Sequence, residues 1–235
     1  MIQTYSMILW SNASKEIFEK SLLKANNLLA ILKEFGPELS PNYITARKKK
    51  DIMEFRGDLD TLKDLLLNGI NKEGKILLDD LGYSVSFISS LLNDDSASIR
   101  LNIGVSNSRF SNNFVVDFPV SFPINNNQII EKLIKLFKRC VIIFNPYWAC
   151  ISNNLNMERY ENYMVNKIPV TIHWINYFDS EVSDKLGEKA ILIAPVNAKE
   201  KFHKGYFVML KRTPLDDNSM KDIILQQNIN KFFKL

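Results

Sequence analysis

The sequence predicts an α+β protein, with a largely antiparallel sheet flanked by helices in a single domain that spans residues 1–235. Three observations favour this class. Helix-like and strand-like patterns come in blocks, whereas a parallel winding would alternate them regularly. The chain contains no internal repeat and no glycine- and serine-rich linker, so no domain boundary is visible. Its 46% hydrophobic and 24% charged residues are typical of an ordinary soluble globular protein.

The N-terminal third predicts two helices. Apolar residues recur at helical spacing over residues 14–35, and the Gly-Pro pair that follows ends this first helix. Residues 38–50 are expected to form an exposed loop. A second helix should open at Asp58, whose side chain can accept free backbone N–H groups, and should stop before Gly69.

The middle of the chain changes to a strand-like pattern. Apolar and polar residues alternate over residues 83–87 and 99–105, and residues 114–120 form a third apolar run. Three strands in succession, joined by turn-rich loops, indicate antiparallel pairing. A helix over residues 128–144 follows, with one apolar face and a basic stripe on the opposite face. The stripe consists of Lys132, Lys135, Lys138 and Arg139.

The C-terminal part is predicted to be mixed. Residues 170–178 are apolar on both alternating faces, which indicates an interior strand covered on both sides. The S-x-x-D sequence that begins at Ser219 predicts a capping box and a final helix to the C-terminus. Three further strands and one short helix complete the expectation: strands at residues 147–152, 190–194 and 206–211, and a helix at residues 157–165.

The recognised catalytic motifs are missing from the sequence. No glycine-rich phosphate loop occurs, and the only two histidines, His173 and His203, cannot build a multi-histidine metal centre. We expect Cys140 and Cys150 to be reduced core thiols. The adjacent carboxylates at residues 79–80, 94–95 and 216–217 are interpreted as turn or solvated residues. We therefore expect no catalytic residues, no metal and no cofactor.

Charge is spread unevenly along the chain. Residues 51–95 carry ten acidic and four basic side chains, a formal charge of −6 in a chain of +4. This acidic span can mark a surface that faces a basic partner. The first ten residues have no basic segment and only a short apolar run, so they predict neither a signal peptide nor a membrane helix. We expect a cytoplasmic protein without a membrane partner.

The order of several aromatic motifs is itself informative. Trp10 precedes the first helix, the run F-V-V-D-F-P follows an alternating strand, N-P-Y-W follows the basic helix, and W-I-N-Y lies in the later strand. In this order the chain resembles the immunity protein 52 family of bacterial polymorphic toxin systems. It departs from the family pattern at Ser11, Asn145, Tyr147 and His173.

The resemblance implies an α+β inhibitor that binds a cognate toxin, commonly one of restriction-endonuclease-like type. The aromatic and proline positions of the motifs are expected to be structural core, because such side chains bury large areas. They are Trp10, Pro146, Trp148, Trp174 and Tyr177.

Three functions follow as hypotheses, in order of preference. The first is an immunity protein that occludes its toxin in the cytosol, without catalysis. The second is a nucleic-acid-binding protein that uses the basic stripe together with residues 47–50. The third is an enzyme that uses His173. For the first, the expected partner-binding residues are Asp58, Asp60, Asp64, Asp79, Asp80, Asp94 and Asp95.

Overall fold

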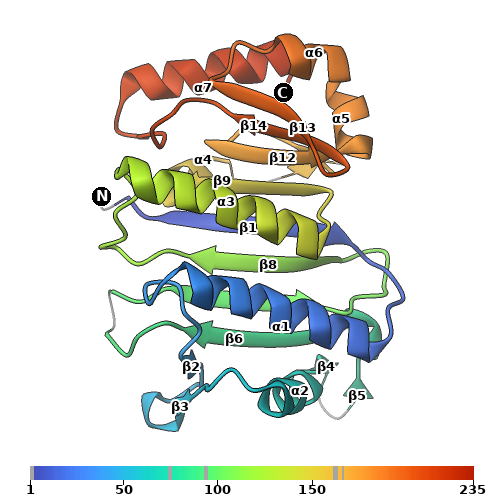
Figure 1. The fold of residues 1–235 in the computed structure, drawn as a ribbon. Helices are drawn as coiled ribbons and strands as arrows, with labels where there is room; N and C mark the ends of the chain where they lie inside the picture. Colours follow the sequence, from blue (N-terminus) through green and yellow to red (C-terminus); the bar gives the residue numbers. More distant parts are fainter. Residues whose placement is uncertain (1–2, 74–75, 93–94, 161–163, 166) are drawn as a thin grey trace.

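The computed structural model describes residues 3–73, 76–92, 95–160, 164–165 and 167–235. Within them, ten strands form one antiparallel sheet in the order β13-β14-β12-β9-β1-β8-β7-β6-β2-β3, which confirms the α+β class (Figure 1). These strands are β1 (Tyr5–Asn12), β2 (Tyr43–Ile44), β3 (Met53–Glu54), β6 (Tyr83–Ile88), β7 (Ser98–Ile103), β8 (Ser111–Asp117), β9 (Trp148–Asn153), β12 (Ile175–Asp179), β13 (Ala198–Phe202) and β14 (Gly205–Met209). Two short hairpins lie outside the sheet: β4 (Lys72–Glu73) with β5 (Ile76–Leu77), and β10 (Met164–Val165) with β11 (Ile168–Pro169).

Helices cover the sheet unequally on its two faces. They are α1 (Phe18–Phe35), α2 (Leu59–Asn68), α3 (Asn127–Phe144), α4 (Asn154–Arg159), α5 (Ser180–Leu186), α6 (Glu188–Ile193) and α7 (Met220–Phe233), with short 3-10 turns at Lys49–Asp51 and Asp79–Leu81. Helices α1 and α3 lie side by side across one face (Figure 1). Apolar residues of β8 and β14 pack beneath α3, where Phe114 contacts Phe144 and Phe207 contacts Phe137.

The second face is covered over one half of the sheet only. Over β9, the ring of His173 stacks on Trp148 at 5.6 Å and hydrogen-bonds to Asn156 of α4. Over β6 and β7, by contrast, Ser84 and Arg100 are exposed. The sheet is therefore a three-layer structure at β9 and a two-layer structure at β6 and β7, which explains why only the latter strands show clean alternation in the sequence.

The central strand β1 was not predicted. It pairs with β8 on one side and with β9 on the other, with Trp10 opposite Asn113 and Trp148. Met7 and Leu9 are fully buried on one face and Ile8 is 4% exposed on the other. Apolar residues on both faces are what a central strand requires, but in the sequence they form only a short apolar run.

The predicted strand over residues 170–178 is wrong in its first half. Only Ile175–Asp179 is strand, whereas residues 171–174 are buried without pairing to a neighbouring strand. Side-chain amides take the place of that neighbour: Ile172 N–H donates to Asn230 Oδ1, and the Ile172 carbonyl accepts from Gln226 Nε2. The segment can be buried without a strand partner because polar side chains satisfy its backbone N–H and C=O groups.

Four other local predictions need correction. The apolar run at 190–194 is helix α6, not a strand, and the helix expected over 157–165 is α4, which ends at Arg159. Within the expected loop 38–50, β2 pairs with β3 and β6. Ser219 makes no side-chain cap bond, and the Asp222 carboxylate accepts instead from Asp216 N–H and Lys211 Nζ.

The remaining elements agree with the sequence patterns. Asp58 caps α2 by accepting from Thr61 N–H at 2.8 Å, and β6, β7 and β8 are successive antiparallel neighbours. Asn145 ends α3 in the left-handed conformation. Cys140 and Cys150 are buried free thiols, and burial raises the pKa of both. The long periodic segments were therefore predicted correctly in type and place.

Candidate functional site

The acidic side chains expected to bind a partner do not form one patch. Asp60 and Asp64 are exposed on α2, next to the capping Asp58. Asp79 and Asp80 precede β6, whereas Asp95 follows it. Because a six-residue strand spans roughly 20 Å, these two groups lie at opposite ends of β6. Asp94 lies outside the described residues.

Three of these acids have structural partners. Backbone hydrogen bonding from Thr61 lowers the pKa of Asp58, as expected of a helix cap. Asp80 accepts from Asn107 Nδ2 at 2.8 Å, and Asp95 accepts from both the backbone N–H and the hydroxyl of Ser121. Among the described members of this set, the acids that remain available to a partner are Asp60, Asp64 and Asp79, all of which are exposed.

The basic stripe of α3 is partly neutralised. Lys138 pairs with Glu200 and lies 4.7 Å from the centre of the Phe207 ring. Arg139 pairs with Glu34 of α1 at 2.6 Å. Lys132 and Lys135 remain exposed along a groove of about 230 Å³ between α1 and α3. Two of the four cations thus already have carboxylate partners.

The aromatic residues of the motifs are largely inside the protein. Trp148, Trp174 and Tyr177 are at most 1% exposed, and Pro146 is buried. Trp10 is half-buried and stacks on Trp148 with ring centres 4.4 Å apart. Side chains this deeply buried offer no surface to a partner while the fold is intact.

His173 lies in a buried amide network. Its Nδ1 is 2.8 Å from Asn156 Oδ1, which makes Nδ1 the protonated nitrogen, because a carbonyl oxygen can only accept. Asn156 also exchanges hydrogen bonds with Gln226 of α7. Burial lowers the pKa of His173 to about 3, so the ring is neutral at physiological pH.

This lowered pKa predicts acid sensitivity of the fold. An unfolded histidine titrates near pH 6.5, so below that pH the unfolded chain binds a proton that the folded chain does not. Stability should then fall as the pH drops from about 6.5 to about 5, by up to about 1.4 kcal/mol per pH unit, in urea denaturation. His173→Gln should flatten this slope and His203→Gln should retain most of it. Equal slopes in the two variants would contradict the assignment.

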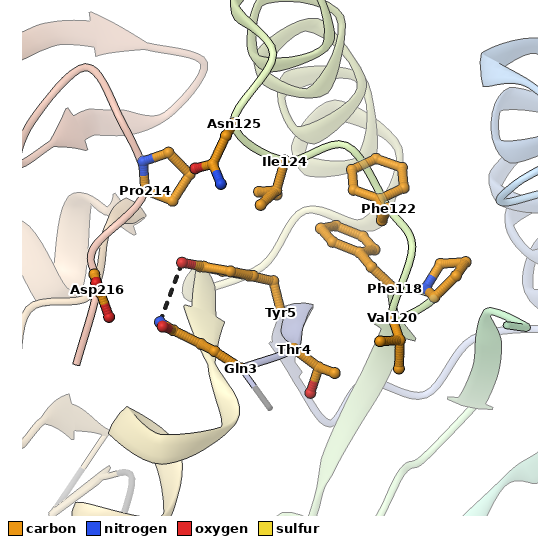
Figure 2. Close-up of a pocket in the computed structure, with 11 residues that line it drawn as sticks. Gln3, Thr4, Tyr5, Phe118, Val120, Phe122, Ile124, Asn125, Pro214 and Asp216 are labelled. Atoms are coloured by element: carbon orange, nitrogen blue, oxygen red, sulfur yellow. Dashed lines mark hydrogen bonds between the residues drawn. The ribbon is translucent and has the colours of Figure 1, made fainter. Parts of the chain in front are cut away.

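A pocket lies at the end of the central strands, between the loop that follows β8 and the loop that precedes α7 (Figure 2). It measures about 280 Å³. Phe118, Phe122 and Ile124 line it from the first loop, and Pro214 and Asp216 from the second. Gln3 and Tyr5 of the N-terminal segment also line it, as does Asn125.

The wall around Tyr5 is held by one carbonyl group. The Tyr5 hydroxyl and Gln3 Nε2 donate to the Leu215 carbonyl at 2.8 and 2.9 Å, and Asn153 Nδ2 donates to it at 3.1 Å. Burial, followed by the nearby carboxylates, raises the pKa of Tyr5. The hydroxyl therefore stays protonated and anchors the loop before α7 to the start of β1.

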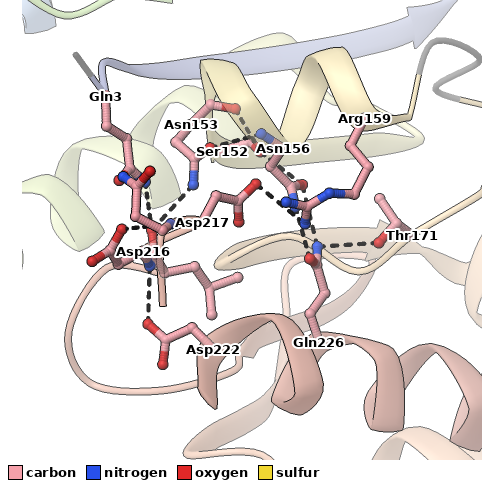
Figure 3. A network of polar contacts seen from close by, with 12 residues as sticks. Gln3, Ser152, Asn153, Asn156, Arg159, Thr171, Asp216, Asp217, Asp222 and Gln226 are labelled. Carbon is pink, nitrogen blue, oxygen red and sulfur yellow. Dashed lines mark hydrogen bonds and ion pairs between the residues drawn. The ribbon is translucent and has the colours of Figure 1, made fainter. Parts of the chain in front are cut away.

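Three carboxylates lie behind and beside this wall (Figure 3). Asp217 pairs with Arg159 at 3.4 Å and Asp222 pairs with Lys211 at 2.6 Å. Asp216 is exposed and accepts from Asn218 N–H. Among the ion pairs of the described residues, none includes Asp216. It also lines a neighbouring open groove of about 660 Å³.

The sequence alone could not locate this site. Asp216 and Asp217 were interpreted as a turn pair, and nothing in their spacing indicates that one is buried against Arg159 while the other faces a pocket. The pocket joins residues from the start of the chain, from the loop after β8 and from the loop before α7. Only the sheet order brings these three segments together.

Comparison with known proteins supports the fold. One solved structure, described as "Pseudomonas aeruginosa T6SS protein PA0821", is similar with a TM-score of 0.62 at 10% sequence identity. The similarity covers 98% of this chain and 73% of that chain. At this identity it concerns the fold alone.

The sequence comparisons found no relative: no protein-family model and no curated protein matches the chain. Membership of the immunity protein 52 family therefore stays a prediction from the motifs. Among the residues that the structure describes, no helix combines the length and the apolar character needed to cross a bilayer.

Proposed function

We propose that this chain is an immunity protein that binds a cognate bacterial toxin of nuclease type and neutralises it in the cytosol, without catalysis. The observation that carries the proposal is the fold, shared over 98% of the chain with a protein of the type VI secretion system. The order of the aromatic motifs supports it independently. The mechanism is occlusion, in which the inhibitor covers the toxin surface that holds phosphates.

The acidic span would supply part of this contact. Besides its carboxylates, it carries several exposed apolar side chains, which a protein interface can bury. Five of them lie on or near α2 and the β4–β5 hairpin: Met53, Leu59, Leu67, Ile76 and Leu77. A nuclease needs a basic surface, and acids mixed with apolar groups complement such a surface.

The test is protection of a host cell. A toxin gene identified next to this gene in the native host is expressed with and without the present chain, and the two purified proteins are tested for complex formation. Protection together with a stable complex supports the proposal. Growth arrest in both cultures, with no complex, contradicts it.

Charge reversal on α2 should slow association with the toxin. Asp60→Lys combined with Asp64→Lys replaces attraction by repulsion, so the association rate should fall roughly tenfold or more at low salt, with a weaker salt dependence. Both side chains are exposed, so the melting temperature should change little. Stopped-flow kinetics over a salt series measures the effect.

The matched control reverses two exposed acids on other helices, Glu131→Lys on α3 and Asp184→Lys on α5. Equal association rates for the α2 variant and this control would show that the toxin contact lies outside the acidic span. Reversal of Asp80 or Asp95 is less informative, because both hold neighbouring loops.

The second candidate, nucleic-acid binding, retains Lys132 and Lys135 of the stripe and the basic residues 47–50 as exposed cations. Its other two stripe residues already have carboxylate partners, so we rank it below the immunity function.

A further inference from the structure

We propose that the pocket beside Asp216 receives a basic side chain of the partner, with a guanidinium group as its preferred occupant. The inference rests on the proposed function, since it names the part of the toxin that the pocket would bind. It starts from the difference between Asp216 and its two neighbouring carboxylates.

Asp216 is the available acid of the group. Asp217 and Asp222 form ion pairs with Arg159 and Lys211, and these two carboxylates are also buried. Asp216 is exposed, has no ion pair among the described residues and lines the pocket. A cation entering from solvent would find one uncompensated carboxylate at this wall.

The opposite wall suits the rest of an arginine side chain. The rings of Phe118 and Phe122 lie 4.7 Å apart between centres and are 4% and 7% exposed, so an alkyl stem would contact their edges together with the exposed side chain of Val120 (Figure 2). A planar guanidinium also stacks on aromatic rings more readily than an ammonium does. Its paired N–H groups match the geometry of one carboxylate.

The size of the pocket favours a single side chain over a whole metabolite. Clefts that hold drug-sized ligands measure roughly 300–1,000 Å³, and this pocket of about 280 Å³ lies just below that range. The adjoining groove shares Asn125, Pro214 and Asp216 with it and is open. The main chain that carries the inserted side chain can pass along this groove, which Lys211 and Lys221 also line.

The pocket wall is pre-organised for binding. Tyr5 and Gln3 are fixed by the Leu215 carbonyl, and that loop is tied down by the ion pair between the buried Asp217 and the exposed Arg159. A rigid pocket loses little conformational freedom on binding, which favours its use as an anchor point in an interface.

Amide chemical shifts of the isotope-labelled protein test the pocket without the toxin. The probe is Nα-acetyl-arginine N-methylamide, and its neutral isostere Nα-acetyl-citrulline N-methylamide is the control ligand. We expect saturable shifts at Gln3, Tyr5 and Asn125 with the arginine probe and much weaker ones with citrulline. Asp216→Asn, which keeps the acceptor for Asn218 N–H, should weaken arginine binding about tenfold, the usual effect of a charge-assisted hydrogen bond.

Asp184→Asn on α5 is the matched control and should leave the affinity unchanged. No saturation with arginine up to its solubility limit, equal binding of citrulline, or an unaffected Asp216→Asn variant would each overturn the pocket proposal.

A second measurement uses the toxin. Asp216→Lys should weaken complex formation at least tenfold relative to Asp184→Lys. The lysine at position 216 would place a positive charge against the inserted cation, whereas the lysine at position 184 would lie outside the pocket. Equal affinities would overturn the pocket proposal while leaving the immunity function intact. Absence of any complex with the unmodified chain would overturn the immunity function, and the arginine titration would still decide the chemistry of the pocket.

Discussion

Replacing Trp148 with alanine should lower the free energy of unfolding by about 3 to 5 kcal/mol, the usual cost of truncating a large buried aromatic side chain. The ring is fully buried on β9, between Trp10 at 4.4 Å and His173 at 5.6 Å. Its removal leaves a cavity under the layer that His173 and α4 form on this face. Trp174→Ala should act similarly, because that ring is 1% exposed and contacts Tyr5.

Denaturation in guanidinium chloride measures the loss, and Phe110→Ala is the control. Phe110 is 52% exposed, so its truncation should change stability by no more than about 0.5 kcal/mol. If Trp148→Ala and Trp174→Ala instead fold normally and lose toxin binding, the two tryptophans are interface anchors and their assignment to the core is wrong.

Replacing Gln226 with leucine should cost about 2 to 5 kcal/mol, because it leaves several buried polar groups without partners at about 1–3 kcal/mol each. Gln226 is 1% exposed on α7 and joins three segments (Figure 3). Its Oε1 accepts from Asn156 Nδ2 at 2.7 Å, and its Nε2 donates to the Ile172 carbonyl at 2.8 Å and to Thr171 Oγ1 at 3.1 Å.

The neighbouring Gln227 offers a matched control, because it has the same side chain on the same helix but is exposed. Gln227→Leu should leave the unfolding midpoint nearly unchanged. Equal midpoints for the two variants would mean that the amide network contributes nothing to stability and that apolar packing alone holds α7 in place.

Sequence patterns predicted those elements whose stability depends on a single buried face. Helix α3 and strands β6 to β8 show the expected periodicity because one side faces the core and the other faces solvent. Strand β1 shows no such contrast, and its partners lie about a hundred or more residues away in the chain. Its identity as a strand depends on contacts that no local pattern can reveal.

The same limit applies to the segment before β12 and to the candidate site. Residues 170–174 are apolar enough for a strand, yet amide side chains of α7 satisfy the backbone of Ile172, and a residue such as Asn230 gives no sign of this from its neighbours. Asp216 and Asp217 are adjacent and chemically identical, so their division into a buried, paired carboxylate and an exposed one is visible only in the fold.

The central position of β1 has a consequence for the timing of folding. Strand β1 is synthesised before β8, its first partner in the sheet, by about a hundred residues, and before β9 by more. At roughly 5–20 residues per second, a ribosome needs on the order of ten seconds to supply both partners. During refolding, pulsed hydrogen exchange should find the amides of β6 and β7 protected before those of β1, since their hairpin is local. Simultaneous protection would contradict this order. Until β8 emerges, β1 has no strand partner, and until β9 emerges one edge of this strand, which is apolar on both faces, stays open to pairing with another chain during translation.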